Sequence, residues 1–169
     1  MLKKINVKRI CLGGILIALT YVFTMFVSIP LSSTGYINLS DFFIIFTTIS
    51  IDPICGLLVA LIAPALADLT LGYFIYIPFT IISKGLEFLF AYLINKNVKS
   101  NLKFGILWIS PLMMALVYII PDLIVLGFDQ YIASFINLGF NFLQGIVGLI
   151  LALILNQVFI KYKIMEKIG

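Results

Sequence analysis

The chain has 169 residues, of which 63% are hydrophobic, 14% aromatic and 11% charged, with a mean hydropathy of +1.21. An average soluble domain is about half apolar and about a quarter charged. Because a domain of this length buries only about 70% of the surface that its unfolded chain exposes, this composition excludes a soluble globule. It predicts an all-α membrane protein that forms a single domain over residues 1–169.

Several classes of chemistry are excluded by missing residues and motifs. The sequence contains no histidine, and Cys11 and Cys55 form neither a disulfide framework nor a metal-binding pattern. It also lacks the glycine-rich P-loop, the serine nucleophile elbow and the HExxH motif. We therefore expect no enzymatic activity, no cofactor and no metal site. The basic clusters contain no interleaved aromatic residues, so nucleic acid is not an expected partner.

Six apolar runs are predicted to form membrane helices, because a spanning helix needs about 20 mostly apolar residues. The first run is longer than the core of a signal peptide, which is about 7–15 residues, so we interpret it as a retained span. The second run is short, and the sixth is longer than a bilayer requires. The runs lie at about 10–29, 37–51, 53–71, 75–95, 104–121 and 131–160.

The basic residues predict the orientation of these spans. Ten of the eleven Lys and Arg residues fall on one side of the membrane if the six spans alternate, which by the positive-inside rule places both termini in the cytoplasm. Cys11 and Cys55 would then lie near the reducing side and remain free thiols. The ten residues are Lys3, Lys4, Lys8, Arg9, Lys96, Lys99, Lys103, Lys161, Lys163 and Lys167.

Carboxylates near predicted helix starts have a structural interpretation. Asp41 and Asp129 are placed where a carboxylate caps free N–H groups and suits the helix dipole, and we favour capping for both. Asp52, followed by Pro53, indicates an N-cap with proline at the first helical position.

Asp68 has a different position, near the end of the third predicted span. The helix dipole disfavours a negative charge there, so another group should compensate it. Tyr73 and Tyr76 are close in sequence and are candidates for that role.

Two ionisable residues, Lys84 and Glu87, lie inside the fourth predicted span. Ionisable groups at membrane depth cost roughly 3 kcal/mol each on insertion scales and by default mark a functional site. Their i, i+3 spacing places them on one helix face. They are either an internal ion pair that holds the helices together or part of a ligand cavity, and the sequence leaves both interpretations open.

Amide side chains follow one face of the sixth predicted span. Asn137, Asn141 and Gln144 have i, i+4, i+7 spacing, and amides at this depth must find hydrogen-bond partners. Contacts between helices satisfy that need, as does a polar ligand, and we favour ligand contact for Asn141. In the first outer loop, Gly35, Tyr36 and Asn38 are candidates for a lid or a pocket wall.

Taken together, these residues resemble the substrate-specific S component of energy-coupling factor (ECF) vitamin transporters. The resemblance extends over nearly the whole chain. The likeness lies in the six spans, a small-residue face at Gly14 and Ala18, and three local strings. It is closest to the riboflavin, hydroxymethylpyrimidine and pyridoxine branch, although Ser40 stands where that branch usually has glycine. The strings are Gly35-Tyr-Ile-Asn-Leu-Ser-Asp41, Ala65-Leu-Ala-Asp68 with Leu71-Gly-Tyr73, and Pro78-Phe-Thr-Ile-Ile-Ser-Lys84-Gly-Leu-Glu87.

The resemblance implies a bacterial cytoplasmic-membrane protein that binds a vitamin or vitamin precursor from outside with high affinity. Such a subunit docks on a transmembrane coupling protein and two cytoplasmic ATPases, and Gly14 and Ala18 match the docking motif of the family. The resemblance places the ligand pocket in the outer half, and we expect about half of the matching residues to contact ligand. These residues are Tyr36, Asn38, Asp41, Asp68, Tyr76, Lys84, Glu87, Asn141 and Gln144.

The chemistry of the outer side favours a neutral or weakly basic aromatic substrate, because the outer loops are acidic and disfavour multiply anionic ligands. Pyridoxine and hydroxymethylpyrimidine fit this description, and riboflavin is a further candidate. Because Lys84 can bind a carboxylate, pantothenate is also a candidate. Two other functions are considered. One is a stand-alone secondary transporter or channel, although the sequence shows no inverted repeat. The other is a membrane scaffold without a small ligand.

Overall fold

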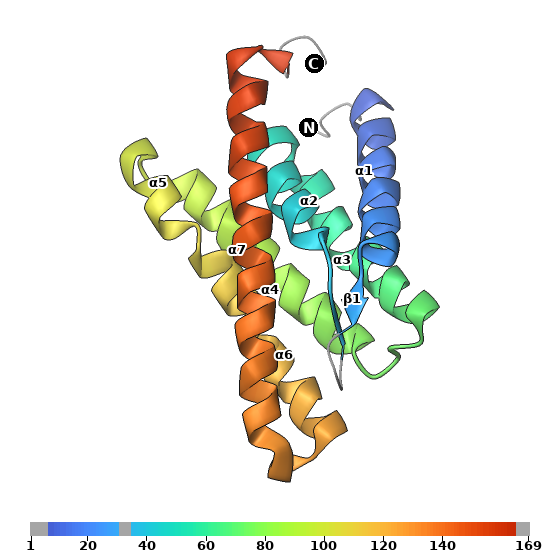
Figure 1. Ribbon diagram of the computed structural model, residues 1–169. Coiled ribbons are helices and arrows are strands. Elements are labelled where there is room, and N and C mark those ends of the chain that lie inside the picture. Colours follow the sequence, from blue (N-terminus) through green and yellow to red (C-terminus); the bar gives the residue numbers. More distant parts are fainter. Residues whose placement is uncertain (1–6, 31–34, 165–169) are drawn as a thin grey trace, which may run out of the picture.

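The computed structural model describes residues 7–30 and 35–164, and helices make up most of this part of the chain (Figure 1). Three residues of the basic clusters, Lys3, Lys4 and Lys167, lie outside the described residues. A short antiparallel ribbon joins β1 (Ile29–Pro30) to β2 (Tyr36–Ile37). The helices are α1 (Val7–Phe26), α2 (Ser40–Phe46), α3 (Pro53–Leu71), α4 (Ile77–Asn97), α5 (Ser100–Ile106), α6 (Ile109–Leu126) and α7 (Tyr131–Lys161).

The long helices confirm the prediction of an all-α membrane protein. Within the described residues, four helical segments are long and apolar enough to cross a membrane. Two shorter apolar segments, Ile10–Phe26 and Ser40–Ile51, match the first and second predicted runs. The four long segments are Pro53–Leu71, Ile77–Asn97, Leu102–Leu126 and Phe128–Lys161.

The predicted end of the fifth run lies too early in the sequence. The sequence predicted a helix that ends at residue 121, whereas α6 continues through Pro121 to Leu126. A proline inside a membrane helix is tolerated because neighbouring groups take over the backbone hydrogen bonding that the ring prevents. Pro64 likewise lies inside α3.

The start of α3 confirms the prediction for Asp52 and Pro53. The Asp52 carboxylate accepts hydrogen bonds from the backbone N–H groups of Ile54, at 2.8 Å, and Cys55, at 3.2 Å. Pro53 occupies the first helical turn, where its missing N–H group costs nothing. At the other end Gly72 adopts the left-handed conformation (φ +84°) that commonly closes a helix.

The prediction that Asp41 and Asp129 cap helices is wrong. α2 begins after Leu39 and α7 begins after Gln130, and neither helix has a side-chain cap hydrogen bond. Asp41 instead binds side chains of two other helices, and Asp129 is exposed in a short 3₁₀ turn. A side chain at a helix start is free to turn away from the backbone when a stronger partner, here a buried ammonium group, lies within reach.

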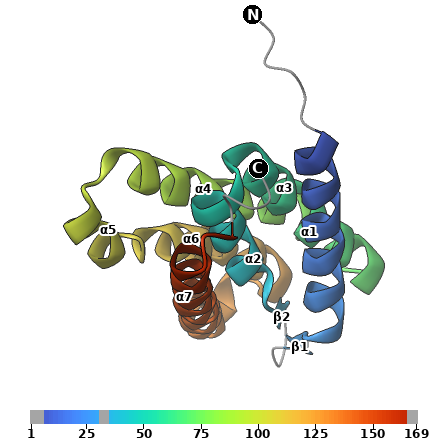
Figure 2. The same cartoon turned by 90° about the horizontal axis from the view of Figure 1, so that it is seen from above.

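The helices form a bundle in which α7 contacts both α6 and α2, while α3 contacts α1 and α4. The first turn of α1 and the last turn of α7 lie at the same end of the molecule (Figure 1). From above, α1 and α5 lie on opposite sides of α2 (Figure 2), and residues along one face of α1 are exposed. One long face of α1 therefore remains free of other helices.

Glycines on α7 let its neighbours approach closely. A Cβ atom added at Gly148 would lie 2.7 Å from both the Asp41 Cβ and the Phe42 backbone nitrogen. A Cβ atom at Gly145 would collide with Pro111 of α6. Small residues at these two positions therefore fix the distance of α7 from the start of α2 and from α6.

We predict that Gly148→Ala lowers the free energy of unfolding by about 1–3 kcal/mol, because the added methyl group overpacks the contact with α2. Gly139→Ala is the matched control, since a Cβ atom at Gly139 meets nothing within 4 Å. That variant should leave stability unchanged or raise it by up to about 1 kcal/mol, since alanine is the better helix former. Unfolding of the purified variants in detergent measures the difference, and equal stability of the two variants would contradict the prediction.

Candidate functional site

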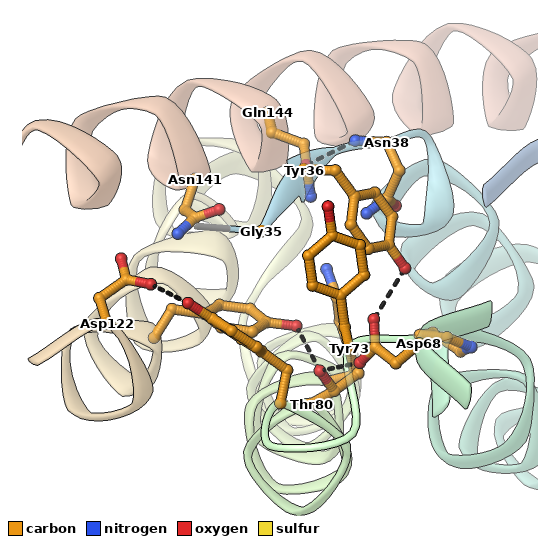
Figure 3. A pocket seen from close by; sticks show the side chains of 13 residues that line it. Gly35, Tyr36, Asn38, Asp68, Tyr73, Thr80, Asp122, Asn141 and Gln144 are labelled. Carbon is orange, nitrogen blue, oxygen red and sulfur yellow. Dashed lines mark hydrogen bonds between the residues drawn. The ribbon is translucent and has the colours of Figure 1, made fainter. Parts of the chain in front are cut away.

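A pocket lies between the β2 segment and helices α3, α4, α6 and α7 (Figure 3). Its empty space, including the part that is open to solvent, is about 480 Å³. Aromatic and polar side chains make up most of its wall. The lining residues are Gly35, Tyr36, Asn38, Pro64, Asp68, Tyr73, Tyr76, Thr80, Lys84, Tyr118, Asp122, Asn141 and Gln144.

Asp68 forms one side of the pocket and is held by hydroxyl groups. Tyr36 donates a hydrogen bond to Oδ1 at 2.8 Å, and Thr80 donates to Oδ2 at 2.5 Å. Tyr118 in turn donates to the Thr80 hydroxyl at 3.1 Å. The sequence predicted that another group compensates the negative charge of Asp68. The groups that do so are the hydroxyls of Tyr36 and Thr80, not those of Tyr73 or Tyr76.

Tyr36 is suited to this role as a neutral donor. Burial, together with the neighbouring Asp68 carboxylate, raises the pKa of the Tyr36 phenol well above its usual range. The phenol therefore keeps its proton and its hydrogen bond at neutral pH. Through this bond the β2 segment, which lies between α1 and α2, is fastened to α3.

Asp122 of α6 forms the opposite side of the pocket (Figure 3). Its carboxylate accepts a hydrogen bond from the Tyr76 hydroxyl at 2.7 Å and one from the Asn137 amide at 3.1 Å. These contacts join α6 to the start of α4 and to α7. They also account for the predicted interior orientation of Asn137.

Lys84 lies in the pocket wall and is bound from behind. Its ammonium group forms an ion pair with Asp41, and a Glu87 oxygen lies 3.7 Å away. Gln144 joins the same cluster, because its amide donates to Asp41 and its carbonyl oxygen accepts from the Asn38 backbone N–H at 2.7 Å. Asp41, Lys84 and Glu87 are each 1% exposed or less.

The structure therefore brings together most of the residues singled out in the sequence. Asp41 and Glu87 do not line the pocket and lie behind Lys84. The other seven line it: Tyr36, Asn38, Asp68, Tyr76, Lys84, Asn141 and Gln144.

Sequence reasoning missed five lining residues, namely Pro64, Tyr73, Thr80, Tyr118 and Asp122, as members of the site. A periodic signal for three of them was present. Thr80 precedes Lys84 by four residues, and Tyr118 precedes Asp122 by four, so each pair shares one helix face. Nothing comparable marks Pro64 or Tyr73.

The small-residue face of α1 lies on the outside of the bundle. Gly14 and Ala18 are both exposed, and a Cβ atom added at Gly14 meets nothing within 4 Å. In contrast, Gly13 lies against Cys55 of α3. Gly14 and Ala18 are therefore not needed for packing within the described part of the chain.

An all-α membrane bundle with a polar and aromatic pocket is suited to binding a small solute. A comparison with protein families gives the finer assignment, because residues 4–161 match the ECF-type riboflavin transporter S component. The chain belongs to this family, and it is therefore a substrate-binding subunit for vitamin uptake and not an enzyme. A search of curated proteins gives no match.

We predict that Tyr36→Phe lowers the free energy of unfolding of the ligand-free protein by about 1–3 kcal/mol, since it removes a hydrogen bond to a charged acceptor. Tyr73→Phe is the matched control. The Tyr73 ring packs on Tyr36 with centroids 5.1 Å apart, and the substitution keeps that contact. Unfolding in detergent measures both variants, and an equal loss of stability would show that the Tyr36–Asp68 bond contributes little.

Proposed function

We propose that this chain captures a vitamin or vitamin precursor of the pyridoxine, hydroxymethylpyrimidine or riboflavin class with high affinity. The observation that carries the proposal is the pocket itself, in a chain of the S-component family. Four tyrosines, Tyr36, Tyr73, Tyr76 and Tyr118, supply aromatic surface for a planar ring. Asn141 and Gln144 add amide groups that donate to and accept from ring substituents.

The proposed binding residues have two roles. Tyr36, Asn38, Asp68, Tyr76, Lys84, Asn141 and Gln144 face the pocket and contact ligand. Asp41 and Glu87 act from behind, because they hold the Lys84 side chain in place.

The proposed topology has six helices crossing a bacterial cytoplasmic membrane as one domain over residues 1–169, with both termini in the cytoplasm. Two observations support it. The start of α1 and the end of α7 lie at the same end of the bundle (Figure 1). The opposite loops contain no Lys or Arg, as the positive-inside rule requires of the outer side.

The proposed partners are a transmembrane coupling protein and two cytoplasmic ATPases of an ECF module. The chain has no P-loop of its own, so ATP-driven transport requires separate ATPase subunits. We assign Gly14 and Ala18 to the docking contact, because both are exposed on α1. A secondary transporter would instead move its substrate without an ATPase, and a scaffold would bind no vitamin.

Thermal unfolding of the purified protein in detergent, with a panel of B vitamins and their precursors, tests the binding function. A ligand that binds only the folded state stabilises it by about 4 kcal/mol at 1,000 times its Kd. We expect a large, concentration-dependent rise in Tm with a compound of the three named classes. Absence of a shift with every compound would contradict the proposed function.

We predict that Gly14→Leu combined with Ala18→Leu abolishes uptake in cells that contain the ECF module but leaves ligand binding unchanged. Two leucines would prevent the close helix approach that small residues permit. Gly139→Leu is the control, because Gly139 is also exposed but lies on α7. Loss of binding in the double variant would contradict the docking role, and so would normal uptake.

A further inference from the structure

Acidic side chains outnumber basic ones around the pocket in the described part of the chain. Four carboxyl groups and one ammonium group are buried there, and each of the five residues is 4% exposed or less. Asp68 and Asp122 line the pocket, whereas Asp41 and Glu87 flank Lys84. Lys84 is the single basic residue among the lining residues, and the other Lys and Arg residues of the sequence lie outside that set.

Lys84 is already matched by protein carboxylates. Its ammonium group is paired with Asp41 and lies 3.7 Å from Glu87. An anionic ligand would have to compete with these two side chains for the same positive charge. The pocket is therefore poorly suited to a carboxylate or a phosphate ester, although it contains a lysine.

Asp68 and Asp122 lie on opposite sides of the pocket (Figure 3). The hydrogen bonds that Asp68 accepts come from Tyr36 and Thr80, whose hydroxyl groups are uncharged. A carboxylate has about four lone-pair sites, so it can accept from a ligand while it keeps these bonds. A buried carboxylate is more stable in its ionised form when a positive charge lies beside it. In this pocket a cationic ligand would supply that charge.

We propose, on the basis of the proposed binding function, that the ligand is a basic heteroaromatic compound that bears an amino group, and that its positive charge lies on the amine or on a ring nitrogen. Asp68 and Asp122 bind N–H or O–H groups on opposite edges of its ring, and the tyrosines contact its faces. This inference narrows the substrate to an amine-bearing ring. It separates that class from neutral riboflavin, from carboxylates such as pantothenate, and from phosphorylated vitamins.

Two matched pairs of compounds test this inference by calorimetric titration of the purified protein at pH 6.5. The first pair is pyridoxamine and pyridoxine, which differ by an amino group in place of a hydroxyl. The second is 4-amino-5-hydroxymethyl-2-methylpyrimidine and its 4-hydroxy analogue. We expect the amino compound to bind at least about tenfold more tightly in one pair or both. Riboflavin, riboflavin 5′-phosphate and pantothenate should bind more weakly than that amino compound.

The results separate the two proposals. If riboflavin or a hydroxyl compound binds more tightly than both amino compounds, the amine inference fails while the vitamin-binding function stands. If pantothenate or riboflavin 5′-phosphate binds most tightly, the charge argument is wrong. If none of the compounds binds, both proposals fail together.

Asn substitutions test whether the carboxylate charges carry the preference. Asp68→Asn and Asp122→Asn should each reduce affinity for the amino compound by at least about tenfold, with a much smaller effect on its hydroxyl partner. Retained binding of the hydroxyl partner shows that the variants are folded. Asp129→Asn is the control, because Asp129 is exposed and does not line the pocket. An unchanged preference in both pocket variants would overturn the inference.

Discussion

The ion pair between Lys84 and Asp41 is the contact on which the rest of the structure depends. Both groups are buried in an apolar bundle, where an uncompensated charge is expensive. Loss of either partner would leave the other charge buried and unpaired, which typically costs about 3–5 kcal/mol. The pair therefore fixes the start of α2 against α4, and Gln144 extends the same contact to α7 and to the backbone at Asn38.

The same constraint shapes the pocket. Asp68 and Asp122 lie in helices where their carboxylates need donors, and these donors come from other parts of the chain. Tyr36 reaches Asp68 from the β2 segment, and Tyr76 reaches Asp122 from the turn before α4. Satisfying the two carboxylates thus brings tyrosines to both sides of one space. The groups that stabilise the walls are also the groups that present aromatic and polar surface to a ligand.

The pocket and the exposed small residues of α1 lie on different helices. The pocket lies among β2, α3, α4, α6 and α7, whereas the exposed small residues Gly14 and Ala18 lie on α1. α1 contacts α3 and contributes no residue to the pocket wall. In the proposed function, this separation allows the ligand to remain bound while α1 contacts an ATP-driven module.

The sequence by itself determined the membrane class, the start of α3 at Asp52 and Pro53, and the helix faces on which polar residues gather. These features depend on composition and on spacing along one helix, which are local properties. Only the tertiary structure decided the partners: Asp41 binds Lys84 rather than capping α2, and Asp68 is compensated by Tyr36 and Thr80. These residues are 12 to 43 positions apart. Helical periodicity shows which way a side chain faces, but packing between helices determines what it meets there.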